Sequence, residues 1–268
     1  MKVPVHDLKN KKVSDLELPR QAQEEYRPDL INRAVNAVRL NMRQSYGASP
    51  LAGLRHSSKL SKRRRKYRGS YGFGISRVNR KILSRRGTRF NWVGAFSPQT
   101  RGGRRAHAPK SDKILSVKIN KKENRLAIRS AISATFNVDV VKNRGHQLPS
   151  TYPVAVVSDL ENITKTKEVR QTLVELGFAN ELARSEIKKI RAGVGKTRGR
   201  PYQKKKGLLL VVSKSSPVMK SARNIAGIDV VEIDALNANV LAPGAMPGRI
   251  TLFTDSAIKR LAEEELYC

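Results

Sequence analysis

The chain contains the apolar run Leu208-Leu209-Leu210-Val211-Val212-Ser213, whose length and composition are typical of a buried strand. A short helix over Val218 to Ile225 follows, ended by Gly227, and a second apolar strand covers Ile228 to Ile233. Strands that alternate with helices predict a parallel sheet with right-handed crossovers. This part of the chain therefore indicates an α/β fold.

The same patterns predict further elements on both sides of this unit. Strands are expected over Lys2 to Asp7, Val13 to Leu18, Pro153 to Ser158 and Ile250 to Thr254. Helices are expected over Ile31 to Met42, Asn120 to about Thr135, Val169 to Leu176, Ala179 to about Arg191, and Asp255 to Glu265, with Asn120 and Glu123 as a capping box. We predict a single α/β domain (1–42 and 112–268) with a mainly parallel sheet flanked by helices, plus a long extended basic loop insertion (43–111).

This insertion has an unusual composition. The 82 residues from Leu30 to Ser111 contain no Asp or Glu but 21 Lys or Arg, out of a net charge of +32 for the chain. Residues 43–110 also hold nine of the 18 glycines and seven aromatic residues, without the period of a helix or strand. Nuclear localisation signals are shorter, and disordered tails rarely carry so many aromatics. Cations that neutralise phosphates and rings that stack on bases predict RNA binding.

The predicted RNA-binding residues are the cations of the insertion, six cations of a second basic stretch, His107 and two aromatic residues. In the insertion they are Arg43, Tyr46, Arg55, Lys59, Lys62, Arg63, Arg64, Arg65, Lys66, Arg68, Arg77, Arg80, Lys81, Arg85, Arg86, Arg89, Trp92, Arg101, Arg104, Arg105, His107 and Lys110. The second stretch, 188–206, has nine Lys or Arg and no acid, and it adds Lys196, Arg198, Arg200, Lys204, Lys205 and Lys206. A solvated loop is the alternative for this second stretch.

Nucleotide binding is not predicted. The segment Gly193-Val194-Gly195-Lys196-Thr197 has Ile190 where a phosphate-binding loop needs a glycine, and Arg198 where a dinucleotide fingerprint needs one. The histidines are scattered, and we expect each to be a surface or RNA-contacting group: His6, His56, His107 and His146.

No catalytic or membrane-spanning arrangement is predicted either. Asp159, Asp234 and Asp255 follow predicted strands, where helix caps are commoner than catalytic carboxylates. Cys268 is the only cysteine, the apolar runs are too short to span a bilayer, and Met1 opens no signal peptide. We expect a soluble, intracellular protein that is not an enzyme, with no cofactor, no metal and no small-molecule substrate. The alternatives are an RNA-modifying α/β enzyme and a basic DNA-architectural protein.

Several motifs resemble the universal family of the fourth large-subunit ribosomal protein, in its archaeal form. The resemblance covers nearly the whole chain, and its motifs are Tyr46 to Gly53, Thr100 to Lys110, Asn120 to Ala134, Arg198 to Tyr202, Ser221 to Asn224, Leu236 to Ala238 and Leu241 to Gly244. The resemblance implies a cytoplasmic protein of the ribosome that stabilises large-subunit ribosomal RNA beside neighbouring ribosomal proteins. It also implies a long loop that lines the polypeptide exit tunnel, and no catalysis.

The chain departs from the family pattern at Ala108, where proline is expected, and over Arg68 to Gly74. If the insertion folds back on itself, the middle of 43–110, near residues 76–77, lies farthest from the domain. The predicted tunnel-lining tip therefore consists of Tyr67, Arg68, Tyr71 and Phe73.

Overall fold

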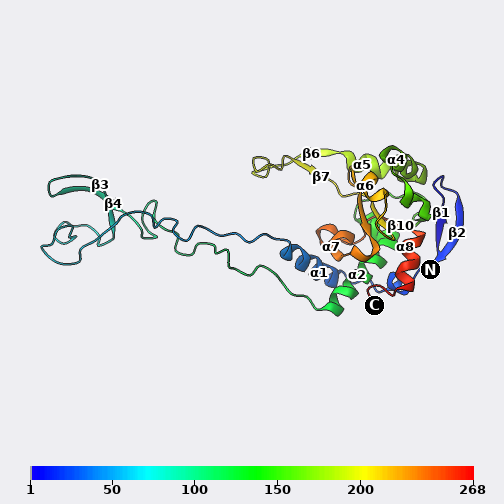
Figure 1. Cartoon of the computed structure of the whole chain (residues 1–268), viewed down its shortest axis with the longest axis horizontal. Helices are drawn as coiled ribbons and strands as arrows, with labels where there is room; N and C mark the ends of the chain where they lie inside the picture. Colours follow the sequence, from blue (N-terminus) through cyan, green and yellow to red (C-terminus); the bar gives the residue numbers. More distant parts are fainter. Residues whose placement is uncertain (1) are drawn as a thin grey trace. The chain divides into compact units, whose positions relative to one another are not determined.

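Each strand predicted from an apolar run is present in the computed structural model, which describes residues 2–268 (Figure 1). The strands are β1 (Lys2–His6), β2 (Lys12–Glu17), β3 (Arg80–Arg86), β4 (Arg89–Gly94), β5 (Ala155–Val156), β6 (Lys188–Ile190), β7 (Tyr202–Lys204), β8 (Leu209–Val212), β9 (Asp229–Glu232) and β10 (Thr251–Thr254). The α-helices are α1 (Pro28–Asn41), α2 (Lys121–Phe136), α3 (Val138–Asn143), α4 (Thr166–Leu173), α5 (Ala179–Glu186), α6 (Val218–Arg223), α7 (Ala238–Leu241) and α8 (Asp255–Glu263). Short 3₁₀ or π segments are η1 (Arg20–Gln23), η2 (Ser158–Asn162), η3 (Val174–Phe178), η4 (Ile233–Ala235) and η5 (Pro243–Ala245).

Six strands form one sheet in the order β2-β1-β5-β10-β8-β9. Only β1 and β2 pair antiparallel, and the other neighbours are parallel. The prediction of an α/β fold with a mainly parallel sheet is confirmed. Strand β10 is the last in the chain, yet it lies between β5 and β8.

The two faces of this sheet are covered by different helices. Leu209, Val211 and Phe253 pack with apolar residues of α1, α2, α7 and α8 on one face. Leu210 and Leu252 point to the other face, where they pack with α4, α5 and α6. Side chains alternate between faces along a strand, so both faces of these short apolar strands are buried.

Contacts divide the chain into two units. The globular unit comprises residues 1–42 and 116–268, and the arm comprises Arg43–Leu115. The arm contains no helix, but it does contain the antiparallel pair β3–β4, which was not predicted from the sequence. The alternation of apolar and polar residues in these strands is hard to detect in the sequence, because arginine and glycine dominate the surrounding segment.

Two local predictions are wrong, and one helix was missed. Helix α5 ends at Glu186 instead of Arg191, because residues 188–190 pair as β6 with β7 and their side chains are exposed. Helix α3 was not predicted. Asn120 makes no side-chain cap hydrogen bond, and Glu123 instead forms an ion pair with Arg33 of α1 at 3.2 Å.

Candidate nucleic-acid interface

The β3–β4 hairpin of the arm brings aromatic side chains to one face. Arg86 pairs with Arg89 across a two-residue turn in which Gly87 has φ +56°, a conformation that favours glycine. Phe90 and Trp92 lie two residues apart on β4, and their ring centroids are 5.4 Å apart. Tyr67 meets Phe90 edge to face, also at 5.4 Å. The hairpin is therefore held together by an aromatic cluster.

Arginines of the arm lie over aromatic rings, one over Trp92 of this cluster and one over Tyr71. The guanidinium carbon of Arg80 is 5.5 Å from the centroid of Trp92, and that of Arg77 is 5.3 Å from Tyr71. Arg80 is only 9% exposed and donates to the carbonyl oxygen and the hydroxyl of Ser76. Its placement therefore differs from that of a free phosphate-binding side chain, because its donors are used inside the arm.

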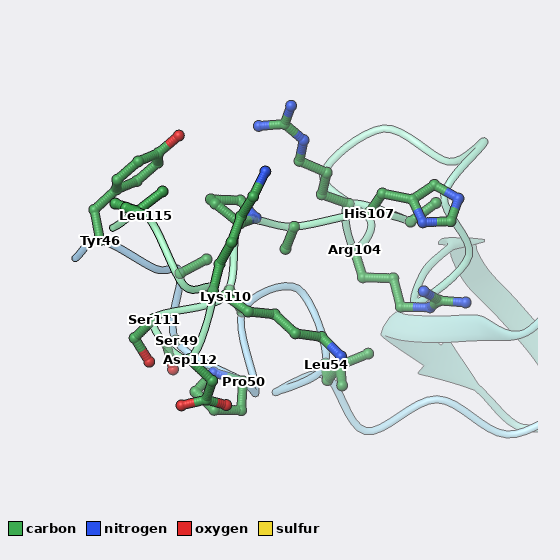
Figure 2. Close-up of a pocket in the computed structure, with 17 residues that line it drawn as sticks. Tyr46, Ser49, Pro50, Leu54, Arg104, His107, Lys110, Ser111, Asp112 and Leu115 are labelled. Carbon is green, nitrogen blue, oxygen red and sulfur yellow. The ribbon is translucent and has the colours of Figure 1, made fainter. Parts of the chain in front are cut away.

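A groove lies between two segments of the arm, residues 46–54 and 104–115 (Figure 2). The backbones approach so closely that a Cβ on Gly47 would lie 2.5 Å from the amide nitrogen of Ser111. A Cβ on Gly53, which has φ +74°, would lie 2.5 Å from the Cα of Arg104. The amide of Ala48 also donates to the carbonyl of Pro109 at 2.9 Å. Glycines at these positions allow the two segments to be joined.

The groove has a volume of about 1110 Å³, and most of the charged residues in its lining are basic. Figure 2 shows Tyr46 at one end, Arg104 and His107 at the other, and Lys110 between them. Asp112 is a carboxylate in the lining. A ring and several cations around one open groove suit a nucleic-acid strand, whose phosphates and bases need both kinds of contact.

Most of the predicted RNA-binding side chains are exposed. The exceptions are Arg68, Lys81, Trp92 and Arg104, which are half-buried, and Arg80, which is buried. The ion pairs found within residues 2–268 all join groups of the globular unit, so no carboxylate pairs with an arm cation there. At the predicted tip, Tyr67, Tyr71 and Phe73 are 56%, 38% and 70% exposed. The arm thus presents its charge to solvent.

The second basic stretch forms the β6–β7 hairpin. Lys196, Arg198 and Arg200 lie in its loop, and the glycine-rich segment 193–197 is part of that loop. Arg191 closes the loop, because its Nε donates to the carbonyl of Arg200 at 3.1 Å. The arrangement lacks the strand-to-helix turn of a phosphate-binding loop.

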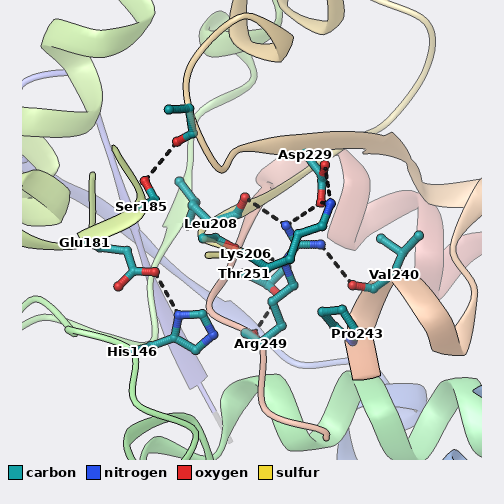
Figure 3. Close-up of polar contacts among 12 residues, drawn as sticks. His146, Glu181, Ser185, Lys206, Leu208, Asp229, Val240, Pro243, Arg249 and Thr251 are labelled. Carbon is teal, nitrogen blue, oxygen red and sulfur yellow. Dashed lines mark hydrogen bonds and ion pairs between the residues drawn. The ribbon is translucent and has the colours of Figure 1, made fainter. Parts of the chain in front are cut away.

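A buried arginine anchors the base of this hairpin (Figure 3). The Nε of Arg249 donates to the carbonyl of Gly207 at 2.9 Å, and its Nη2 donates to Asp229 at 2.6 Å. Lys206 reaches the same carboxylate at 2.9 Å. Burial lowers the pKa of Arg249 and raises that of Asp229, but for Asp229 the two cations more than compensate and the net shift is downward. This polar network therefore holds the backbone that connects the β6–β7 hairpin to strand β8 of the sheet.

A second buried pair, His146 and Glu181, lies near this network (Figure 3). The Nδ1 of His146 is 2.8 Å from Glu181, which also receives two hydrogen bonds from Arg184. Burial lowers the pKa of His146, and Arg184 and Arg144 add to that effect. Burial raises the pKa of Glu181, but bonds from Arg184 and His146 bring it down to about 2. Because an ionised carboxylate can only accept, the Nδ1 of His146 is the donor in its hydrogen bond to Glu181.

This pair predicts a pH dependence of stability. Because the folded protein lowers the pKa of His146, the unfolded chain binds the proton more readily, and stability present above about pH 6.5 is lost as the pH falls through the folded pKa. We expect the thermal unfolding midpoint to decrease between about pH 7.5 and 5. His146→Asn should flatten this dependence, whereas His107→Asn, in the exposed arm, should leave it unchanged. Equal pH slopes for wild type and His146→Asn would contradict the assignment.

The carboxyl edge of the sheet is filled by Glu161, which follows β5. Its carboxylate accepts hydrogen bonds from Ser213 after β8, from Thr254 at the end of β10, and from Ser256. Burial raises the pKa of Glu161, but these bonds more than offset it and lower the pKa overall. Doubly wound sheets hold ligands at this edge. Here the Glu161 carboxylate occupies this edge, and its oxygens already accept hydrogen bonds from the protein.

Two groups of sequence predictions need correction. His6 and His146 are buried, with exposures of 6% and 7%, so neither is a surface or RNA-contacting group; each side chain is hydrogen-bonded within the globular unit. None of the three strand-end aspartates caps a helix through its side chain, since the cap of α8 is the hydroxyl of Thr254. Asp234 forms an ion pair with Arg260 at 2.7 Å instead.

Residues 2–268 contain no group of three or more His, Cys, Asp or Glu side chains arranged to hold a metal ion. None of their helices has the length and hydropathy needed to cross a membrane.

Some residues of the interface were not predicted from the sequence. Tyr202 and Lys188 are exposed on the β6–β7 hairpin, with the Lys188 Nζ 5.9 Å from the centre of the Tyr202 ring. The signal that could have found them is the match of alternating residues at 188–190 and 202–204 across a glycine-containing loop.

Comparison with known proteins places the chain in a family. Residues 16–264 match the sequence profile of the Ribosomal protein L4/L1 family. The chain is similar to the Large ribosomal subunit protein uL4 of Nanoarchaeum equitans, with 48% identity over 268 residues and full coverage of both chains. It is 42% identical to the protein of the same name from Archaeoglobus fulgidus, over 98% of this chain and 99% of that one. The chain therefore belongs to the Ribosomal protein L4/L1 family.

Proposed function

We propose that this protein is a structural constituent of the large ribosomal subunit that binds and stabilises ribosomal RNA. The observation that carries the proposal is the set of exposed arm cations without carboxylate partners among residues 2–268. Like charges crowded in one segment repel each other, and phosphates supply the opposing charge. Membership of a ribosomal protein family indicates which polyanion this is. The partners would be large-subunit RNA and neighbouring ribosomal proteins, in the cytoplasm.

The arm is proposed to be the inserted extended loop that lines the polypeptide exit tunnel. In this division, the flanks Tyr46 to Arg55 and Arg101 to Lys110 anchor the loop on RNA. The tip residues Tyr67, Arg68, Tyr71 and Phe73 would face the passage. The three rings are exposed, which suits a wall that touches passing side chains.

A structural rather than catalytic role is favoured by the carboxyl edge of the sheet. In an α/β enzyme this edge would offer a ligand pocket with unpaired polar groups. Here the Glu161 carboxylate already accepts hydrogen bonds from Ser213, directly after β8, and from Thr254, at the end of β10. An RNA-modifying activity has no comparable support.

Co-sedimentation tests the proposal. The full chain is expected to remain with large subunits through a high-salt wash, because contacts along the arm and at the β6–β7 hairpin would have to break together. A variant lacking residues 66–77 should still co-sediment, since the anchoring flanks remain, while the response of the tunnel to particular nascent chains changes. Release of the full chain into the supernatant would contradict subunit membership. Loss of assembly only in the shortened variant would contradict the division between anchor and lining.

A further inference from the structure

The β6–β7 hairpin presents a face on which basic and apolar side chains meet. Lys188 pairs with Lys204 and Ile190 pairs with Tyr202 in the antiparallel register. Because side chains alternate along a strand, these four residues share one face, and Lys189 and Gln203 point to the other. The shared face thus has a ring and an aliphatic side chain at one end and two ammonium groups at the other.

The apolar part of this face is exposed to an unusual degree. Ile190 is 73% exposed and Tyr202 is 55% exposed. A two-stranded hairpin has little stability of its own, so leaving such side chains in water adds a cost. A ligand that covers the ring would remove that cost.

The two lysines of this face form no ion pair with a carboxylate of residues 2–268. Like charges directly opposite each other on paired strands are destabilising, and Lys188 and Lys204 are such a pair. Residues 188–206 contain no Asp or Glu. The Lys188 ammonium instead lies 5.9 Å from the centre of the Tyr202 ring. An anion placed beside the ring would satisfy both lysines.

The hairpin is organised without a ligand. The amide of Arg191 donates to the carbonyl of Pro201 at 2.7 Å, directly beyond the paired strands. Lys206, two residues past β7, is held by Asp229 at 2.9 Å. Since both ends of the strand pair are fixed, little ordering entropy is left to oppose binding.

We propose that this face binds an unpaired nucleotide of ribosomal RNA, with its base stacked on Tyr202 and its flanking phosphates held by Lys188 and Lys204. The inference rests on the proposed function and names one contact within it. Specific RNA recognition commonly uses unpaired bases stacked on aromatic side chains. The excess of cations favours RNA over a protein partner.

Three variants of the full chain test this contact. The probe is transcribed large-subunit ribosomal RNA at one fixed salt concentration. Tyr202→Val keeps a residue suited to a strand but removes the ring, and we expect binding about 5- to 150-fold weaker, the range found for losing one stacked base. Tyr202→Phe should bind like wild type because it keeps the stacking surface. Lys188→Gln with Lys204→Gln should lower the log-log salt slope by about 1.4–1.8.

Tyr26→Val serves as the matched control. Tyr26 is 40% exposed and lies outside both basic stretches, so its replacement should leave RNA affinity unchanged. If Tyr202→Val and Tyr202→Phe bind RNA with equal affinity while the wild type still binds, the stacking contact is wrong but the proposed function stands. A face that docks a protein instead of RNA would give these equal affinities. Failure of the wild type to bind the transcript would overturn the proposed function as well.

Discussion

Replacing Arg249 by Met is expected to lower the free energy of unfolding by about 3–5 kcal/mol. The Arg249 side chain is 1% exposed, and its donors satisfy the carbonyl oxygens of Gly207 and Val240 as well as the carboxylate of Asp229. Methionine fills much of the volume but donates no hydrogen bond. The two buried carbonyls would lose their donor, while Asp229 keeps Lys206 and partial contact with water.

Two further substitutions define the cause of this loss. Arg249→Lys keeps the charge but cannot reach several acceptors at once, so we expect an intermediate effect. Arg223→Met removes an exposed arginine of α6 and should change stability by no more than about 0.5 kcal/mol. Denaturant unfolding followed by circular dichroism measures all three. A loss below about 1 kcal/mol for Arg249→Met would show that the network contributes little.

The effect should extend to RNA binding. Arg249 holds the backbone at Gly207, and Arg184 donates to the carbonyl of Lys206 at 2.8 Å. These contacts fix the point at which the β6–β7 hairpin leaves the sheet. Arg249 and Arg184 stabilise the backbone at residues 206–207 and thereby position the exposed cations of the hairpin. Loss of Arg249 should therefore weaken RNA binding as well as folding.

The sheet could be predicted because its strands are short apolar runs between glycines and helices. Leu208 to Ser213 became β8 and Ile250 to Thr254 became β10, within one residue at each end. The order of strands could not be predicted, since β10 pairs between β5 and β8 only through contacts that are distant in sequence. The alternation of strands and helices predicts mainly parallel pairing. It does not predict the position of each strand in the sheet.

Buried charges were the other part that sequence patterns did not predict. Arg249, Glu181 and His146 are of residue types that usually lie at the surface. Only the tertiary structure shows that they are paired inside the globular unit. The hairpins were missed for a related reason. Phe90 and Trp92 alternate with polar residues on β4, but arginine and glycine dominate the surrounding segment and hide the period of two.

For the candidate interface, composition predicted the basic stretches but not their geometry. The groove depends on close backbone approach at Gly47 and Gly53, which no local pattern reveals. Arg80 has the same residue type as its exposed neighbours, yet it is buried against Trp92. Residue type therefore indicates the class of ligand, and packing decides which cations are free to meet it.

Removing five cations from the flanks of the arm is expected to have the largest effect on RNA binding. The variant replaces exposed side chains around the groove and at the ends of the arm by Gln: Arg43, Arg55, Arg101, Arg105 and Lys110. Each phosphate contact contributes about 0.7–0.9 to the log-log dependence of affinity on salt, so the slope should fall by about 3.5–4.5. At about 0.1 M salt, taking about 1 M salt as the reference, this corresponds to a loss of about 3.5–4.5 orders of magnitude in affinity.

A variant with the same loss of charge near the tip is the matched comparison. It replaces Lys62, Arg63, Arg64, Arg65 and Lys66 by Gln, and all five are exposed. If the flanks anchor the arm and the tip lines a passage, the tip variant should lose far less affinity for large-subunit RNA, although its net charge is identical. Titration of both variants over a range of salt concentrations separates position from charge. Equal slopes and equal affinities would mean that the arm binds RNA uniformly along its length, and the division into anchor and lining would be wrong.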